Sequence, residues 1–142
     1  MGCDATDYVL PVLPLFHVNA WGVPYHAALC GCDLALPGPN LYGETLTNLI
    51  DQFKVTVGLG VPTIWAGILN AAQDAPDRLT SLNKTIVGGA AMPQVMMNAY
   101  KRLFCVDMIH SWDLRGVSST MQAWSCPKTV KQPGTCRFAA IG

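Results

Sequence analysis

Charge is scarce in this chain of 142 residues. Charged side chains make up 13% of it, against ~25% in an average soluble protein. Nine basic side chains balance nine acidic ones, and Glu44 is the only glutamate. A nucleic-acid-binding protein needs an excess of Lys and Arg, which is missing. A disordered chain is also excluded, because 51% of the residues are apolar and the net charge is zero.

Long apolar runs, a signal peptide and metal-ligand spacing are missing as well. Pro, Gly, His or Asp interrupts every apolar stretch before the ~18 residues that a membrane-spanning helix needs. The first seven residues carry two Asp and no basic cluster, unlike a signal peptide. We expect the six cysteines to be buried free thiols of a cytoplasmic protein. Only one residue separates Cys30 from Cys32, whereas zinc-binding cysteines are usually ~2–4 residues apart. We predict no metal site.

What the sequence does contain is a regular alternation of short apolar runs and helical patterns. The clearest helix spans 44–54, where Leu46, Leu49, Ile50 and Phe53 recur at i, i+3, i+4 and i+7. Strands are predicted at 9–16, 33–36, 55–57, 85–87 and 106–109. Further helices are predicted at 20–30, 62–72 and 93–104. This alternation predicts an α/β fold with a mainly parallel sheet and alternating helices.

The pattern ends at Trp112. Residues 113–142 show no clean period and contain Pro127 and Pro133, so we expect an irregular or poorly ordered tail. Pro11 and Pro14 fall in the first predicted strand, where prolines suit only an edge or a bulge.

Two segments could carry a ligand site. Gly88 to Pro93 joins a predicted strand to a helix N-terminus, where small residues let a ligand approach the backbone. The G-x-G-x-x-G spacing of dinucleotide-binding proteins is missing there. His17 follows a predicted strand, at the edge where open α/β sheets bind ligands. On local sequence alone, a tight turn without ligand and a structural histidine remain open alternatives.

Four segments taken together resemble one family. They match, in order and spacing, motifs of the AMP-forming acyl-CoA synthetases of the adenylate-forming superfamily. The Asn-Ala-Trp at 19–21 is similar to the medium- and long-chain fatty-acid CoA ligase branch. The matching segments are Leu10 to Gly22, Leu36 to Pro39, Gly60 to Trp65 and Gly88 to Pro93. Residues 1–112 are thereby identified as an AMP-binding-like α/β subdomain, an internal fragment of the family's N-terminal domain.

The resemblance implies a function and a site. The family activates a carboxylic acid with ATP and Mg²⁺ to an acyl-adenylate, then transfers the acyl group to CoA. ATP, Mg²⁺ and CoA are therefore the implied cofactors, and a fatty acid and CoA the implied partners. The implied nucleotide-binding residues are Gly88, Gly89, Ala90, Ala91 and Trp112. The implied acyl and CoA pocket residues are His17, Trp21, Val61, Pro62 and Trp65.

The chain departs from the family after Trp112. There the family continues Gly-x-Thr-Glu, and this sequence has Arg115 in place of the phosphate-holding Thr and Gly116 in place of the Mg²⁺-holding Glu. Glycine has no side chain to supply a hard oxygen ligand. The family's phosphate loop and its C-terminal domain with the catalytic Lys also have no counterpart here.

We therefore expect a fragment or truncated homologue of an ATP-dependent fatty-acid CoA ligase, inactive alone. The alternatives are a non-catalytic acyl- or adenylate-binding module and a structural α/β module. Exposed sheet edges would favour self-association of such a piece.

Overall fold

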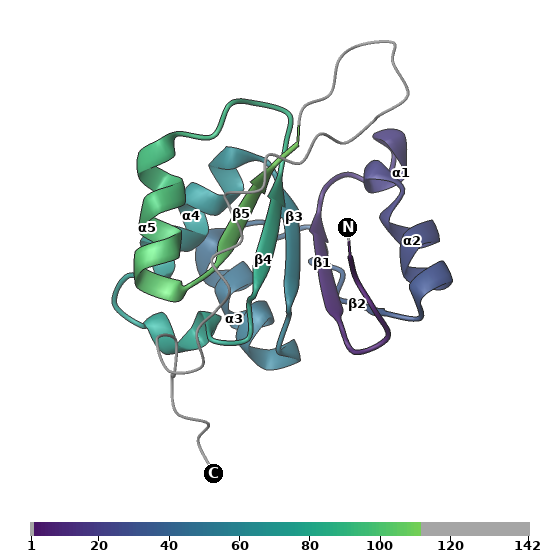
Figure 1. Ribbon diagram of the computed structural model, residues 1–142, viewed down its shortest axis with the longest axis horizontal. Helices are drawn as coiled ribbons and strands as arrows, with labels where there is room; N and C mark the ends of the chain where they lie inside the picture. The colour runs from purple at the N-terminus through teal and green to yellow at the C-terminus, as the bar shows by residue number, and fades with distance from the viewer. Residues whose placement is uncertain (1, 112–142) are drawn as a thin grey trace.

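A five-stranded parallel sheet forms the centre of the structure, a computed structural model that describes residues 2–111 (Figure 1). All four neighbouring strand pairs are parallel, which confirms the predicted α/β class. The strand order is β2-β1-β3-β4-β5. The strands are β1 (Tyr8–Val12), β2 (Asp33–Leu34), β3 (Val57–Gly60), β4 (Lys84–Val87) and β5 (Asp107–His110).

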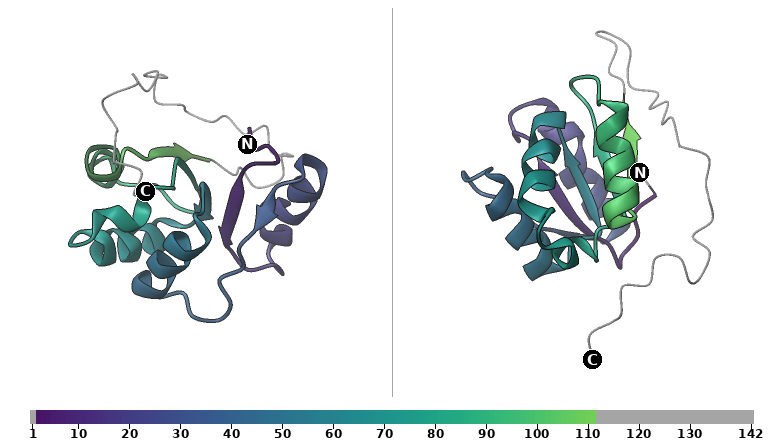
Figure 2. Two further views of the ribbon diagram at one scale, coloured as in Figure 1. Left: turned by 90° about the horizontal axis from the view of Figure 1, so that it is seen from below. Right: turned by 90° about the vertical axis from the view of Figure 1, so that its left-hand side faces the viewer.

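Helices cover both faces of this sheet (Figure 2). The connection from β1 to β2 holds α1 (Val18–Trp21) and α2 (Val23–Cys30), and the other face carries α3 (Gly43–Phe53), α4 (Pro62–Ala72) and α5 (Gln94–Phe104). A short 3₁₀ helix, η1 (Pro76–Leu79), lies between α4 and β4. Because both faces are covered, central strand residues such as Leu59 and Ile86 are buried. Leu10 of β1 faces the α3–α5 side, whereas its neighbour Val9 packs with Val23 of α2.

The core under α4 and α5 is built around Trp65 and Tyr100. Both side chains are fully buried, their rings meet edge to face at 6.0 Å, and the Tyr100 hydroxyl donates to the Trp65 carbonyl at 2.7 Å. Gly58 of β3 makes room for Trp65, because a Cβ at position 58 would overlap the indole ring. Burial raises the pKa of Tyr100, since the charged phenolate would lose its hydration.

Helices α3 and α4 also approach one another through glycine. A Cβ at Gly43, the first residue of α3, would overlap the backbone carbonyl of Gly67 in α4. Of the periodic apolar residues predicted for α3, Leu46 and Ile50 are fully buried and Leu49 is half-buried, whereas Phe53 at the end of the helix is exposed. Glu44 lies exposed in the first turn and forms an ion pair with Arg78 at 2.7 Å.

Strand β1 is shorter than predicted and is not an edge strand. It ends at Val12, so the predicted strand over 9–16 is wrong beyond that residue. Pro11 is tolerated for a local reason. The Tyr8 carbonyl accepts from Thr56 beside β3 and the Val9 carbonyl accepts from Ala35 after β2. By alternation, the nitrogen of Pro11 faces the β2 side, where β2 has already ended.

The predicted helix over 20–30 is also wrong in its first turn. Val18, Asn19, Ala20 and Trp21 all have positive φ, from 48° to 58°, so α1 is a left-handed turn rather than an ordinary helix. The right-handed helix α2 begins only after Gly22. Strand β3 lies two residues later than the predicted strand at 55–57. No helix within residues 2–111 has the length and apolarity to cross a lipid bilayer.

Candidate functional site at the carboxyl edge of the sheet

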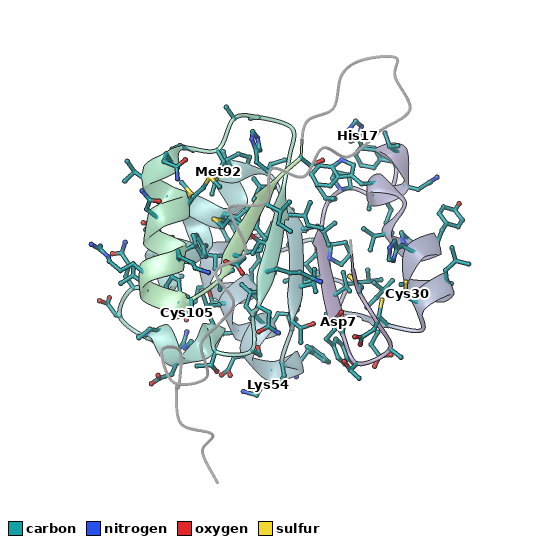
Figure 3. All side chains as sticks on the ribbon, in the orientation of Figure 1. Asp7, His17, Cys30, Lys54, Met92 and Cys105 are labelled. Atoms are coloured by element: carbon teal, nitrogen blue, oxygen red, sulfur yellow. The ribbon has the colours of Figure 1, made fainter. Side chains whose placement is uncertain are left out.

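The carboxyl ends of the strands lie at one end of the molecule. Figure 3 places His17 and Met92 at this end, and Asp7 and Lys54 at the opposite end. From β1 the chain turns to the face that carries α2, whereas from the neighbouring β3 it turns to the face that carries α4. Connections that diverge from adjacent strands define a topological switch point, where open α/β sheets bind ligands.

The segment after β4, from Gly88 to Pro93, passes beside this switch point. Gly88 is buried under the Trp21 ring, because a Cβ at position 88 would lie 2.8 Å from the Cη2 atom of Trp21. Gly89 has φ +81°, a left-handed conformation that favours glycine. A Cβ on Gly89 would lie 3.2 Å from a methyl carbon of Val61. Three segments that are remote in sequence thus meet at residues 88 and 89.

Trp21 reaches Gly88 from the left-handed turn α1. Non-glycine residues in this conformation cost ~1–2 kcal/mol each relative to ordinary helix. Ala20, fully buried, anchors the turn, and the Gly22 amide closes it by donating to the Val18 carbonyl at 3.2 Å. Strained backbone of this kind is concentrated at functional sites. The strained backbone therefore supports a functional role for the position of the Trp21 ring.

The other predicted pocket residues have different surroundings. His17 is exposed and precedes α1, five residues beyond the end of β1, so its placement at a strand end is wrong. Pro62 is half-buried at the start of α4. Trp65 is fully buried in the core, and its indole nitrogen has no hydrogen-bond partner within the part of the chain that the structure describes. Roles for these three residues in an acyl pocket stay predictions.

Ala90 and Ala91 are exposed in the same segment as Gly88 and Gly89. Trp112, the fifth predicted nucleotide-binding residue, lies outside the described residues. The tail predicted for 113–142, with Arg115 and Gly116, lies outside them too.

His110, the last residue of β5, has no role predicted from the sequence. Its Nε2 atom lies 3.0 Å from the carbonyl oxygen of Ala90, and the next amide, of Ser111, donates to the Val87 carbonyl at 2.7 Å. The rule that ligands bind at the carboxyl ends of parallel strands could have identified His110 from the sequence, because His110 does lie at such an end.

Within residues 2–111, the segments at the carboxyl edge carry no formally charged side chain. These segments are 13–22, 60–62, 88–93 and 110–111, and they contain two histidines but no Asp, Glu, Lys or Arg. Within residues 2–111 no cluster of three His, Cys, Asp or Glu side chains could hold a metal ion. Hydrogen bonds from Thr6 lower the pKa of Asp4, and burial raises the pKa of the Cys3 thiol. Both groups precede β1, at the other end of the strands.

The sheet topology and the loop at the switch point define the class of domain. An open parallel sheet with helices on both faces is a doubly wound α/β domain, an architecture in which ligands bind outside the carboxyl ends of the strands. The chain belongs to the AMP-binding enzyme family, whose family model matches residues 1–137. The match bears out the resemblance seen in the four sequence segments.

The relatives are acyl-CoA ligases. The 3-methylmercaptopropionyl-CoA ligase of Ruegeria lacuscaerulensis is 48% identical over 118 residues, covering 83% of this chain and 22% of that protein. The medium-chain-fatty-acid–CoA ligase of Ectopseudomonas oleovorans is 42% identical, with the same coverage of both chains. Among solved structures, a fatty acyl CoA synthetase of Mycobacterium tuberculosis matches with a TM-score of 0.68 and 26% identity. That match covers 80% of this chain and 22% of the other.

The chain therefore spans about a fifth of the length of the ligases that it matches. Its described residues have the fold of part of the N-terminal domain of FACL13 from Mycobacterium tuberculosis, with a TM-score of 0.67 at 24% identity over 80% of this chain and 28% of that one.

Proposed function

We propose that residues 2–111 form part of the acyl-adenylate-binding surface of an ATP-dependent carboxylic acid–CoA ligase. The observation that carries this proposal is the meeting of Trp21, Val61 and the Gly88–Gly89 backbone at the switch point of the sheet. The relatives act on a methylmercaptopropionyl group and on medium-chain fatty acids. We therefore propose an acid with an unbranched apolar chain as the substrate class.

The lack of charged side chains at the carboxyl edge, within residues 2–111, suits the uncharged parts of an acyl-adenylate. An acyl chain and an adenine ring can pack on apolar side chains and exposed backbone. A triphosphate with Mg²⁺ needs positive charge and, for the metal, a carboxylate ligand, and the edge segments within residues 2–111 contain no Lys, Arg, Asp or Glu. The described residues thus do not fit Mg²⁺, and the position that resembles the family's Mg²⁺-holding Glu is Gly116. We propose binding without catalysis by this chain alone, in a cytoplasmic location.

Titration calorimetry with a non-hydrolysable octanoyl sulfamoyl-adenosine tests the binding. We expect saturable binding that Gly89→Ala weakens about fivefold, because alanine disfavours a left-handed backbone by ~1 kcal/mol and shifts the loop. Gly31→Ala is the matched control, since Gly31 has φ +73° but lies at the end of α2, before β2. No heat at high analogue concentration, or equal weakening by both variants, would overturn the proposal.

ATP–pyrophosphate exchange with medium-chain acids tests the absence of catalysis. We expect no exchange by the chain, and none after Gly116→Glu, because one carboxylate does not supply the positive charge that the phosphates need. Robust exchange in either case would contradict this part of the proposal.

A further inference from the structure

We propose that His110 is a positioning residue that fixes the peptide plane between Ala90 and Ala91. The Nε2 atom of His110 lies 3.0 Å from the Ala90 carbonyl oxygen. A carbonyl oxygen only accepts, so the half-buried imidazole must donate from Nε2. This inference rests on the proposed function, because its consequence is the presentation of one backbone donor to the acyl-adenylate.

The loop is fixed at both ends, and Met92 within it packs into the core, which leaves 89–91 as the part that the sheet and the core do not hold. At its start the Gly88 amide donates to the Gly60 carbonyl at 3.4 Å, within the sheet. At its end the Met96 amide donates to the Pro93 carbonyl at 3.0 Å, where α5 begins. Between these points Gly89 adopts φ +81° and Ala90 is exposed. The bond from His110 reaches the loop in its middle.

That bond determines where a neighbouring amide points. A trans peptide is planar, and its C=O and N–H groups point in opposite directions. With the Ala90 carbonyl turned toward His110, the Ala91 N–H is directed away from β5, on an exposed residue. His110 thereby holds the Ala91 N–H ready to donate to a polar atom of the ligand.

The position of His110 is itself fixed by the sheet. His110 is the last residue of β5 and pairs with Val87 of β4. The following amide, of Ser111, donates to the Val87 carbonyl at 2.7 Å, one residue before the loop begins. The strand that carries the imidazole and the strand that leads into the loop are thus hydrogen-bonded neighbours. The sheet therefore holds the His110 imidazole at a fixed distance from the Ala90 carbonyl.

Three substitutions at position 110 separate positioning from packing. The side-chain amide nitrogen of Gln reaches about as far as Nε2 of His, whereas that of Asn reaches only as far as Nδ1. For the octanoyl sulfamoyl-adenosine we expect His110→Leu and His110→Asn to weaken binding about three- to tenfold, the range of one ordinary hydrogen bond. His110→Gln should bind close to the unsubstituted chain. Equal weakening by all three variants, or by none, would overturn the proposal.

A second measurement does not depend on the ligand. Nitrogen-15 NMR of the imidazole at a pH where it is neutral should show the proton on Nε2, and the Ala91 amide resonance should shift in His110→Leu but not in His110→Gln. A proton on Nδ1 would overturn the proposed hydrogen bond from His110 to the Ala90 carbonyl, even if the analogue binds. If the unsubstituted chain fails to bind the analogue, the proposed function falls and the presentation of Ala91 falls with it.

Discussion

At the scale of single residues, the site depends on one aromatic side chain resting on a residue that has none. The Trp21 ring occupies the space that a Cβ of Gly88 would need. The backbone that brings Trp21 there is left-handed over four consecutive non-glycine residues. Position 88 must therefore stay small for as long as position 21 stays aromatic.

A double-mutant cycle tests this dependence. Gly88→Ala alone should destabilise the chain by about 1–3 kcal/mol, the usual cost of overpacking. In a Trp21→Ala background the same substitution should cost about 1 kcal/mol less, because the clashing ring is gone. Urea unfolding followed by circular dichroism gives the free energies.

Gly31→Ala serves as the control for this cycle. Its Cβ would meet only Ala5, at an ordinary 3.7 Å, so its effect should be additive with Trp21→Ala within ~0.5 kcal/mol. Additivity of Gly88→Ala with Trp21→Ala would show that the two residues do not share the space.

His17 and His110 show how far a ligand-binding position can be predicted from sequence alone. The rule that ligands bind where parallel strands end is sound, but applying it needs the strand ends. For His17 the apolar run continued through Phe16, and only the structure shows β1 ending at Val12. For His110 the predicted strand over 106–109 stops one residue short of it, so the strand end was nearly right. Its contact with Ala90 depends on which strands are neighbours, and local periodicity does not encode strand order.

At the scale of elements, the close packing of α3 against α4 depends on one glycine and tolerates change at another. The Cβ of an alanine at Gly43 would overlap the carbonyl of Gly67, whereas a Cβ at Gly67 would lie 3.7 Å from the nearest atoms of Gly43. The first is a backbone clash that only a shift of a helix can relieve, and the second is ordinary contact.

Paired substitutions test this asymmetry. Gly43→Ala should lower the free energy of unfolding by about 3 kcal/mol, at the upper end for overpacking. Gly67→Ala should raise it by about 0.5–1 kcal/mol, because Gly67 lies inside α4 and glycine costs backbone entropy in a helix. Comparable urea midpoints for the two variants would contradict the close approach.

Element prediction worked where periodicity and termination signals agreed. The inward residues of α3 recur at the helical spacing, and Pro62 begins α4 as predicted. It did not work between Val12 and Gly22. A left-handed turn of non-glycine residues has no local sequence signature, because its strain is offset by tertiary contacts such as the burial of Ala20. The predicted strand at 55–57 also missed Gly58 and Gly60, because glycine has a low strand propensity.

At the scale of the whole molecule, one face remains apolar where it meets solvent. Helix α2 has no Asp, Glu, Lys or Arg, and it buries Val23 and Ala27 against the sheet while exposing Tyr25 and Leu29. A helix that is apolar on all sides is normally covered on all sides. The chain spans about a fifth of its relatives' length. Self-association through this exposed apolar face, as through the sheet edges, stays a prediction.

Leu29→Lys tests the contribution of α2. Leu29 is 87% exposed, so lysine should be tolerated in the fold while reducing association through this face. Val95→Lys is the matched control, since Val95 is 81% exposed but lies on α5, in the layer on the other face of the sheet. Light scattering should show a larger monomer fraction for Leu29→Lys than for Val95→Lys. A chain that is fully monomeric without substitution would contradict the prediction.

The strand order also sets the order in which the molecule can assemble. The contact between β1 and the start of β3 joins Tyr8 to Thr56, which are 48 residues apart in the sequence. The pairs β3–β4 and β4–β5 each join residues separated by roughly half that length of chain. Closing a longer loop costs more chain entropy and slows the contact. Strands β3 to β5 can thus pair across short connections, as can β1 and β2, and the contact between β1 and β3 closes the longest loop. That contact lies at the switch point, so we expect the proposed ligand-binding crevice to form only when β1 and β2 meet β3 to β5.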